Sequence, residues 1–103
     1  MALVRIWRTN VDPLRVTEYE RFAQDVSLPM FRAQQGFLGV LFAGAGPARA
    51  VLSFWKDRHA VDALASSPSY RETVARILAT GMLAGETTTE VLELHGGQRP
   101  EVL

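Results

Sequence analysis

Residues 54–71 read FWKDRHAVDALASSPSYR, and this stretch joins the end of a strand to a helix. An apolar run ends in the pair Phe54-Trp55, and the charged residues that follow predict a turn. From Asp57 onward apolar residues recur at helical spacing, until Ser66-Ser67-Pro68-Ser69 interrupts the pattern. Proline is tolerated in the first turn of a helix and a preceding serine can cap it. The stretch therefore predicts two helical pieces, the second beginning at Pro68.

The chain begins with a strand and a helix. Residues 2–10 are rich in strand formers such as Leu3 and Trp7 and end before Asp12-Pro13, so they predict a strand. From Leu14 onward apolar residues recur three or four positions apart, which predicts an amphipathic helix with one face toward a core. The members of this stripe are Val16, Tyr19, Phe22, Val26 and Met30. Pro29 lies inside the helix and is expected to kink or end it, because its ring clashes with a preceding carbonyl.

The middle and the end of the chain supply the remaining elements. The apolar runs 37–43 and 49–55 are joined by residues 44–48, GAGPA, whose composition predicts a hairpin with a loop longer than the tight two-residue type. The second helix is expected over about residues 57–81, with an apolar stripe made of Val61, Leu64, Val74, Ile77 and Leu78. Residues 87–95, TTTEVLELH, are rich in β-branched residues and predict the final strand.

Taken in order, these elements form a β-α-β-β-α-β pattern. The pattern predicts the α+β class and the ferredoxin-like split arrangement, in which an antiparallel four-stranded sheet carries two helices on one face. We expect one domain over residues 1–95 and a loose C-terminal tail over residues 96–103.

The two middle apolar runs have no polar face. An antiparallel strand with one face in water should alternate between apolar and polar residues, so this continuous apolarity predicts that both faces of the sheet are buried. Two helices can cover only one face. We therefore expect a homodimer in which a second copy of the chain covers the other face.

Composition and charge exclude several classes of partner. The chain has 103 residues, with 11 acidic and 11 basic side chains scattered along it, and lacks the basic stripe that binds a phosphate backbone. We therefore expect no nucleic acid as a partner. No apolar run approaches the ~20 residues that span a bilayer, so no membrane is expected, and the lack of a signal-like N-terminus predicts a cytoplasmic protein. There is no cysteine, and no His, Asp or Glu set stands at metal-ligand spacing, so no metal is expected.

Five segments resemble the antibiotic biosynthesis monooxygenase superfamily, whose members form dimeric α/β barrels. They are residues 4–8, 18–22, 35–39, 54–57 and 66–70, and the resemblance extends over roughly residues 3–95. It implies the ferredoxin-like fold and the homodimer. The superfamily includes cofactor-free oxygenases of phenols and quinols, haem-degrading oxygenases and small-molecule isomerases.

The resemblance favours a cofactor-independent monooxygenase acting on a small aromatic or quinol-type metabolite in an apolar pocket between sheet and helices. No cofactor is expected. The haem-degrading branch is disfavoured, because Leu64 and Val74 stand where its members carry a second tryptophan and an iron-ligating histidine. Two alternatives stay open: a non-catalytic dimeric binder or accessory protein for an apolar metabolite, and an isomerase or cyclase of a similar metabolite. Whether the chain is an enzyme at all stays open too.

The aromatic and apolar side chains of the helices are the candidates for binding such a substrate. They are Tyr19, Phe22, Phe31, Trp55 and Leu64, and the competing interpretation of each is plain core packing. Tyr70 follows the helix break and is a candidate for a hydrogen-bonding or proton-handling role, because a buried phenol needs a partner for its hydroxyl.

Polar residues of the first strand are the candidates for stabilising a substrate anion. Arg8 or Asn10 could donate to a substrate oxyanion in a dry site. The competing interpretation is that the arginines form ion pairs with Glu90 or Glu93. Alternation places Arg8 and Asn10 on one face of the strand and Arg5 on the other, and the sequence does not decide which face meets the helices.

Overall fold

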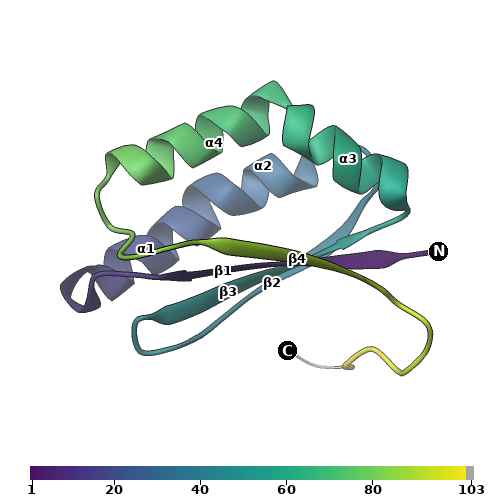
Figure 1. Cartoon of the computed structure of the whole chain (residues 1–103), viewed down its shortest axis with the longest axis horizontal. Helices are drawn as coiled ribbons and strands as arrows, with labels where there is room; N and C mark the ends of the chain where they lie inside the picture. Colours follow the sequence, from purple (N-terminus) through teal and green to yellow (C-terminus); the bar gives the residue numbers. More distant parts are fainter. Residues whose placement is uncertain (102–103) are drawn as a thin grey trace.

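Four antiparallel strands form one sheet, and the helices lie together on one of its faces (Figure 1). The structure is a computed structural model that describes residues 1–101. The strands are ordered β2-β3-β1-β4 across the sheet, and their bounds are β1 Leu3–Asn10, β2 Phe37–Ala45, β3 Ala48–Trp55 and β4 Thr88–Glu93. The predicted α+β, ferredoxin-like fold with its β-α-β-β-α-β order is thereby confirmed.

The helical region between β1 and β2 is continuous but changes its winding along its length. It consists of a 3₁₀ turn η1 (Pro13–Arg15), α1 (Val16–Phe22), a π-helical stretch η2 (Ala23–Ser27) and α2 (Leu28–Arg32). In a regular α-helix the ring of Pro29 would clash with the carbonyl of Asp25. The wider π turn that contains Asp25 accommodates the ring. Pro29 therefore coincides with a change of winding and does not end the helix.

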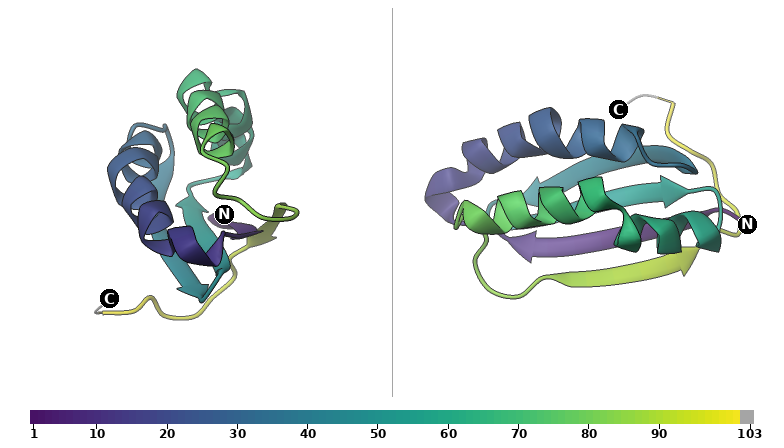
Figure 2. Two further views of the ribbon diagram at one scale, coloured as in Figure 1. Left: turned by 90° about the vertical axis from the view of Figure 1, so that its left-hand side faces the viewer. Right: turned by 90° about the horizontal axis from the view of Figure 1, so that it is seen from above.

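The helical region between β3 and β4 is broken where the serines and proline predict it. It consists of α3 (Arg58–Ser66) and α4 (Pro68–Ala79), with Ser67 in an extended conformation between them. The hydroxyl of Ser67 accepts a hydrogen bond from the main-chain N–H of Tyr70 at 3.4 Å, which caps α4. Figure 2 shows that this pair of helices and the α1–α2 region lie side by side above the sheet.

The hairpin between β2 and β3 is tighter than the composition suggests. Ala45 pairs with Ala48, so only Gly46 and Pro47 connect the two strands, and the expectation of a longer loop is wrong. Gly46 has a φ of +57°, a conformation that glycine adopts without strain. The ring of Pro47 holds its own φ near −65°, and Gly46 and Pro47 together form the two-residue connection.

The helix-facing side of the sheet carries the core. Leu3 of β1 and Trp55 of β3 are paired in register, and both are buried against Phe31 of α2 and Leu64 of α3. Because side chains alternate along a strand, Arg5 also points toward the helices. Val4, Ile6, Arg8 and Asn10 point to the opposite face.

The opposite face of the sheet is mostly apolar, and no helix within residues 1–101 covers it. The β-ladder places Ile6, Leu52 and Leu41 side by side on this face, and all three are partly exposed in the single chain. Leu92 of β4 lies on the same face and is 46% exposed.

Beyond β4, residues 94–101 form no helix or strand, and residues 102–103 of the predicted tail lie outside the described part of the chain. Within residues 1–101, no helix combines the length and the apolar character needed to cross a membrane.

Candidate functional site

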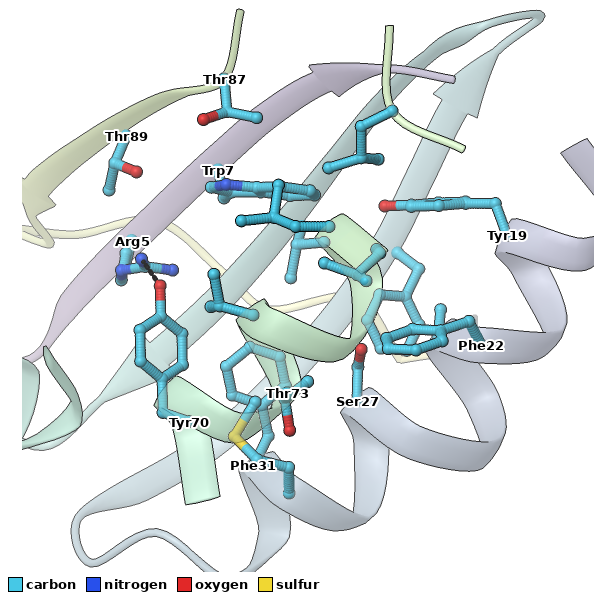
Figure 3. A pocket seen from close by; sticks show the side chains of 18 residues that line it. Arg5, Trp7, Tyr19, Phe22, Ser27, Phe31, Tyr70, Thr73, Thr87 and Thr89 are labelled. Carbon is cyan, nitrogen blue, oxygen red and sulfur yellow. Dashed lines mark hydrogen bonds between the residues drawn. The ribbon is translucent and has the colours of Figure 1, made fainter. Parts of the chain in front are cut away.

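A cavity of about 260 Å³ lies between the sheet and the helices and is partly open to solvent (Figure 3). Strands and helices both line it, and among the lining side chains are Arg5 and Trp7 from β1, Tyr19 from α1, and Tyr70 from α4. Most of the other lining side chains are apolar. The volume is slightly below the roughly 300–1,000 Å³ of drug-sized ligand sites, so the cavity suits a small aromatic molecule.

Arg5 and Tyr70 form a hydrogen-bonded pair on the cavity wall. The Arg5 Nη2 group donates to the Tyr70 hydroxyl oxygen at 2.7 Å, and the guanidinium carbon lies 5.3 Å from the centre of the tyrosine ring. Since the tyrosine oxygen accepts from arginine, its own O–H remains free to donate to a ligand. Among the 18 lining residues Arg5 is the one charged side chain, and none is Asp, Glu or His.

Local structure positions this pair. Arg5 lies in the central strand β1, opposite Ser53 of β3 and Val91 of β4, so its backbone is held on both sides. Tyr70 is in the first turn of α4, three residues after the Ser67 cap and two after Pro68. The helix break therefore places the tyrosine hydroxyl over the face of β1 that carries Arg5.

Tyr19 approaches the same cavity from α1. Its side chain is only 4% exposed, and burial raises the pKa of its hydroxyl to about 12, although the nearby positive charge of Arg49 acts in the opposite direction. Its hydroxyl points into the cavity in Figure 3. At neutral pH Tyr19 is thus a protonated phenol and acts as a hydrogen-bonding group, not as a base.

A second, more polar cavity of about 310 Å³ borders the first across Tyr19. In it Arg49 forms an ion pair with Glu20 at 2.8 Å and donates to the carbonyl of Gly46 at 3.0 Å. The arginine side chain lies against Gly44, where a Cβ atom would come within 2.5 Å of it. The guanidinium is therefore held between the hairpin and α1 by partners of this chain.

The structure brings four of the predicted site residues to one cavity. Tyr19, Phe22, Phe31 and Tyr70 all line it.

The other two predicted substrate-binding residues lie in the core instead. Trp55 is fully buried, and its indole N–H donates to the Ser53 hydroxyl at 2.9 Å. Leu64 is 1% exposed and packs in the same cluster. Neither lines the cavity, so core packing describes both better than substrate binding.

Arg8 and Asn10 lie on the face of β1 that points away from the cavity. Arg8 is an exposed side chain whose partner is Glu90 at 3.2 Å, which is the ion-pair interpretation that the sequence left open. Arg5 occupies the position over the cavity. Trp7 is the sequence signal that could have identified this face of β1 as the buried one, because Trp7 and Arg5 point to the same side of the strand. Burying the largest apolar side chain of the strand removes the most apolar surface from water.

Solved structures with the same fold are similar to this chain in three dimensions. One is the ActVA-Orf6 monooxygenase of Streptomyces coelicolor in complex with the ligand nanaomycin D, with a TM-score of 0.82 and 18% identity over 97% of this chain and 93% of that chain. Another is SnoaB, a cofactor-independent oxygenase from Streptomyces nogalater, with a TM-score of 0.75 and 14% identity over 93% of this chain and 95% of that chain. A third, described as an antibiotic biosynthesis monooxygenase, has a TM-score of 0.72 and 13% identity over 91% of this chain and 99% of that chain.

Comparisons of sequence alone find no such relation. No family model matches the chain, and no curated protein matches it. The chain therefore has the fold of the antibiotic biosynthesis monooxygenase proteins, as the resemblance implied. At these identities the likeness shows the fold, and the reaction has to be argued from the site.

Proposed function

We propose that this protein is a cofactor-independent monooxygenase of a small phenol or quinol, which binds in the cavity between the sheet and the helices. The observation that carries the proposal is the Arg5–Tyr70 pair, a single cation and a free O–H donor in a cavity with otherwise mostly apolar walls. Such a site favours a ligand that is aromatic and carries a developing negative charge. A monooxygenase-like function is also consistent with the oxygenases among the structural neighbours.

The pair would act by stabilising the phenolate form of the substrate. A guanidinium and an oriented hydroxyl stabilise an anion more strongly in a water-poor cavity than in water, because the local dielectric is low. Within residues 1–101, no carboxylate or imidazole lines the cavity to remove the proton. We therefore assign the loss of the phenol proton to solvent, driven by the affinity of Arg5 and Tyr70 for the anion.

The reaction then needs only the substrate and molecular oxygen. The phenolate ring carbon forms a bond to one oxygen atom, and the resulting ring peroxide loses the other oxygen atom as water to leave a quinone. A phenol with one free ring position thus reacts with O₂ to give a quinone and water, and the substrate supplies all the electrons that oxygen accepts. The protein contributes orientation, exclusion of water and charge stabilisation.

Oxygen uptake by the purified protein tests this function. We expect protein that has been treated with a chelator to remove metal ions to accelerate oxygen consumption by phenols such as 2-naphthol above the rate in buffer. A quinone product should be detectable by absorbance. If naphthols bind without any oxygen uptake, the non-catalytic binder is the correct interpretation. If neither binding nor uptake occurs across a panel of phenols and quinols, the cavity is not a site for this class of ligand.

We also propose that the protein is a homodimer formed through the open face of the sheet. The support is the row of aliphatic side chains on that face, including Ile6, Leu41 and Leu52, together with the exposed Leu92. A face of this kind is an unfavourable surface to leave in water. Stable dimers bury on the order of 800 Å² per partner.

Sedimentation velocity at micromolar concentration distinguishes the dimer from the monomer. The wild type should sediment as a dimer, and Leu52→Glu should sediment as a monomer, because a buried unpaired carboxylate costs several kcal/mol. Leu14→Glu is the matched control, since Leu14 is 94% exposed in the 3₁₀ turn η1 and lies off the sheet. A monomeric wild type would contradict the proposal.

A further inference from the structure

The second cavity contains a cation that the proposed reaction does not use. The side chain of Arg49 is only 12% exposed and lines this cavity of about 310 Å³. Neither Arg5 nor Tyr70 belongs to its wall, so the positive charge here is separate from that of the first cavity. A mostly buried cation is unfavourable unless an anion and hydrogen-bond acceptors surround it. The partners of Arg49 therefore indicate which kind of ligand suits this cavity.

The hairpin holds Arg49 in a defined position. Its Nε–H donates to the carbonyl of Gly46 at 3.0 Å. The side chain also lies across Gly44, where a Cβ atom would come within 2.5 Å of the arginine Cδ and 2.8 Å of its Nε. A side chain at position 44 would therefore displace the arginine. Because the guanidinium is already ordered, a ligand that binds it does not have to order a free side chain.

The anion that neutralises Arg49 is weakly held. Glu20 accepts a single hydrogen bond from Nη1 at 2.8 Å, and its side chain is 58% exposed. An ion pair with an exposed partner contributes little net stability, because water screens it and a long side chain has to be ordered. Within residues 1–101 the hydrogen bonds of Arg49 use Nε and Nη1, and no fully buried side-chain nitrogen lacks a partner. The Nη2 group is therefore accessible to a ligand.

The rest of the wall suits the carbon skeleton of an organic anion. Ala23, Phe42 and Ala43 supply apolar surface, and the side-chain amide of Gln24 adds a neutral hydrogen-bonding group. A small aromatic acid matches this combination. Its carboxylate pairs with the guanidinium, which binds carboxylates through parallel N–H groups, while its ring displaces water from the apolar wall.

We infer that the second cavity is a binding site for a small aromatic carboxylate, and that Arg49 binds its carboxylate group. Glu20 is the resident counter-ion of this site and competes with the ligand for the guanidinium. Removing the charge of Glu20 should therefore strengthen binding, although Glu20 lines the cavity. The site is independent of the proposed reaction, because it uses neither Arg5 nor Tyr70 and involves no oxygen chemistry.

Titration with benzoate, followed in NMR spectra of the nitrogen-15-labelled protein, tests the site. Benzamide is the neutral probe of nearly the same shape, and inorganic phosphate is an anion without an apolar ring. We expect benzoate to shift the main-chain amide signals of Gly44 and Gly46, which lie against Arg49. It should bind at least about tenfold more tightly than benzamide, as one charge-assisted hydrogen bond provides. Phosphate should bind more weakly than benzoate, because it gains nothing from the apolar wall.

Four variants locate the binding. Glu20→Gln should tighten benzoate binding about two- to fivefold, the scale of an exposed ion pair. Glu72→Gln is the matched control, because it removes the same charge from an exposed position of α4 that lines neither cavity, and it should leave the affinity unchanged. Arg49→Met should weaken binding at least about tenfold. Arg5→Met should not weaken it, since Arg5 lines only the first cavity.

Several outcomes would overturn the inference. Loss of benzoate binding in Arg5→Met but not in Arg49→Met would place the ligand in the first cavity. Equal affinity for benzamide or phosphate would show that the site does not recognise an aromatic carboxylate. Unchanged or weaker binding in Glu20→Gln, or no binding to it and to the wild type, decides against the site even if Arg49→Met does not fold. Oxygen uptake with 2-naphthol still tests the proposed function on its own.

Discussion

Replacing Arg5 by methionine is expected to lower the rate of oxygen uptake with 2-naphthol about ten- to a thousand-fold. This is the range for removing one preorganised donor at a developing oxyanion. Methionine keeps much of the length and apolar volume of the side chain, but it removes the one charged group that lines the cavity within residues 1–101 and the 2.7 Å hydrogen bond to Tyr70. The loss should appear in kcat, because the charge on the substrate grows during the reaction.

Two further variants locate the effect at the pair. Tyr70→Phe removes the hydroxyl and keeps the ring, so a large loss of kcat indicates that the hydroxyl contacts the reacting oxygen, whereas an unchanged rate leaves the ring a packing role. Arg8→Met is the matched control on the same strand, since Arg8 points away from the cavity and pairs with Glu90. Equal losses in Arg5→Met and Arg8→Met would contradict the assignment of the site to the helix-facing side of β1.

Replacing Trp55 by alanine is expected to lower the free energy of unfolding by about 3–5 kcal/mol, the range for deleting a large buried aromatic side chain. Trp55 is fully buried, and its ring meets those of Phe31 and Phe37 edge-on at centroid distances of 6.3 and 5.8 Å. The alanine variant would leave a cavity among these rings and free the Ser53 hydroxyl. The melting temperature should fall by more than about 10 °C.

The comparison variants distinguish packing from ligand binding. Trp55→Phe keeps an aromatic ring and loses the 2.9 Å hydrogen bond to Ser53, so its loss of stability should be clearly smaller. Leu14→Ala, at a 94% exposed position, should change the free energy of unfolding by no more than about 0.5 kcal/mol. A stable Trp55→Ala protein that no longer binds naphthols would return Trp55 to the substrate-binding residues.

The fold follows from local patterns that need no tertiary information. Strand alternation, helical spacing and the helix-breaking residues Ser67-Pro68 place each element close to its observed bounds. The same helix break places Tyr70 in the first turn of α4. The aromatic residues Tyr19, Phe22 and Phe31 were predicted as pocket residues, because a helical stripe must face the sheet.

Two features depend on backbone geometry that local patterns do not describe. The loop composition GAGPA predicts a long connection, but strand pairing extends to Ala45 and Ala48 because Gly46 can adopt a positive φ. Pro29 predicts a kink or an end of the helix, but the π turn at Ala23–Ser27 accommodates it. In both places a local adjustment of the backbone decides the geometry, and residue propensities do not describe that adjustment.

By itself, the sequence determines the order of the elements, the helix break and the set of aromatic side chains that face the sheet. Only the tertiary structure decides that Arg5, and not Arg8, lies over the cavity, and that Trp55 and Leu64 belong to the core. The physical reason is that successive side chains of a strand point to opposite faces of the sheet. If the other face of β1 were buried, every side chain placed in the core or cavity would lie outside it, and every outer one would lie inside. Which face of β1 is buried depends on how the helices pack on the whole sheet, since that packing sets how much apolar surface each choice removes from water.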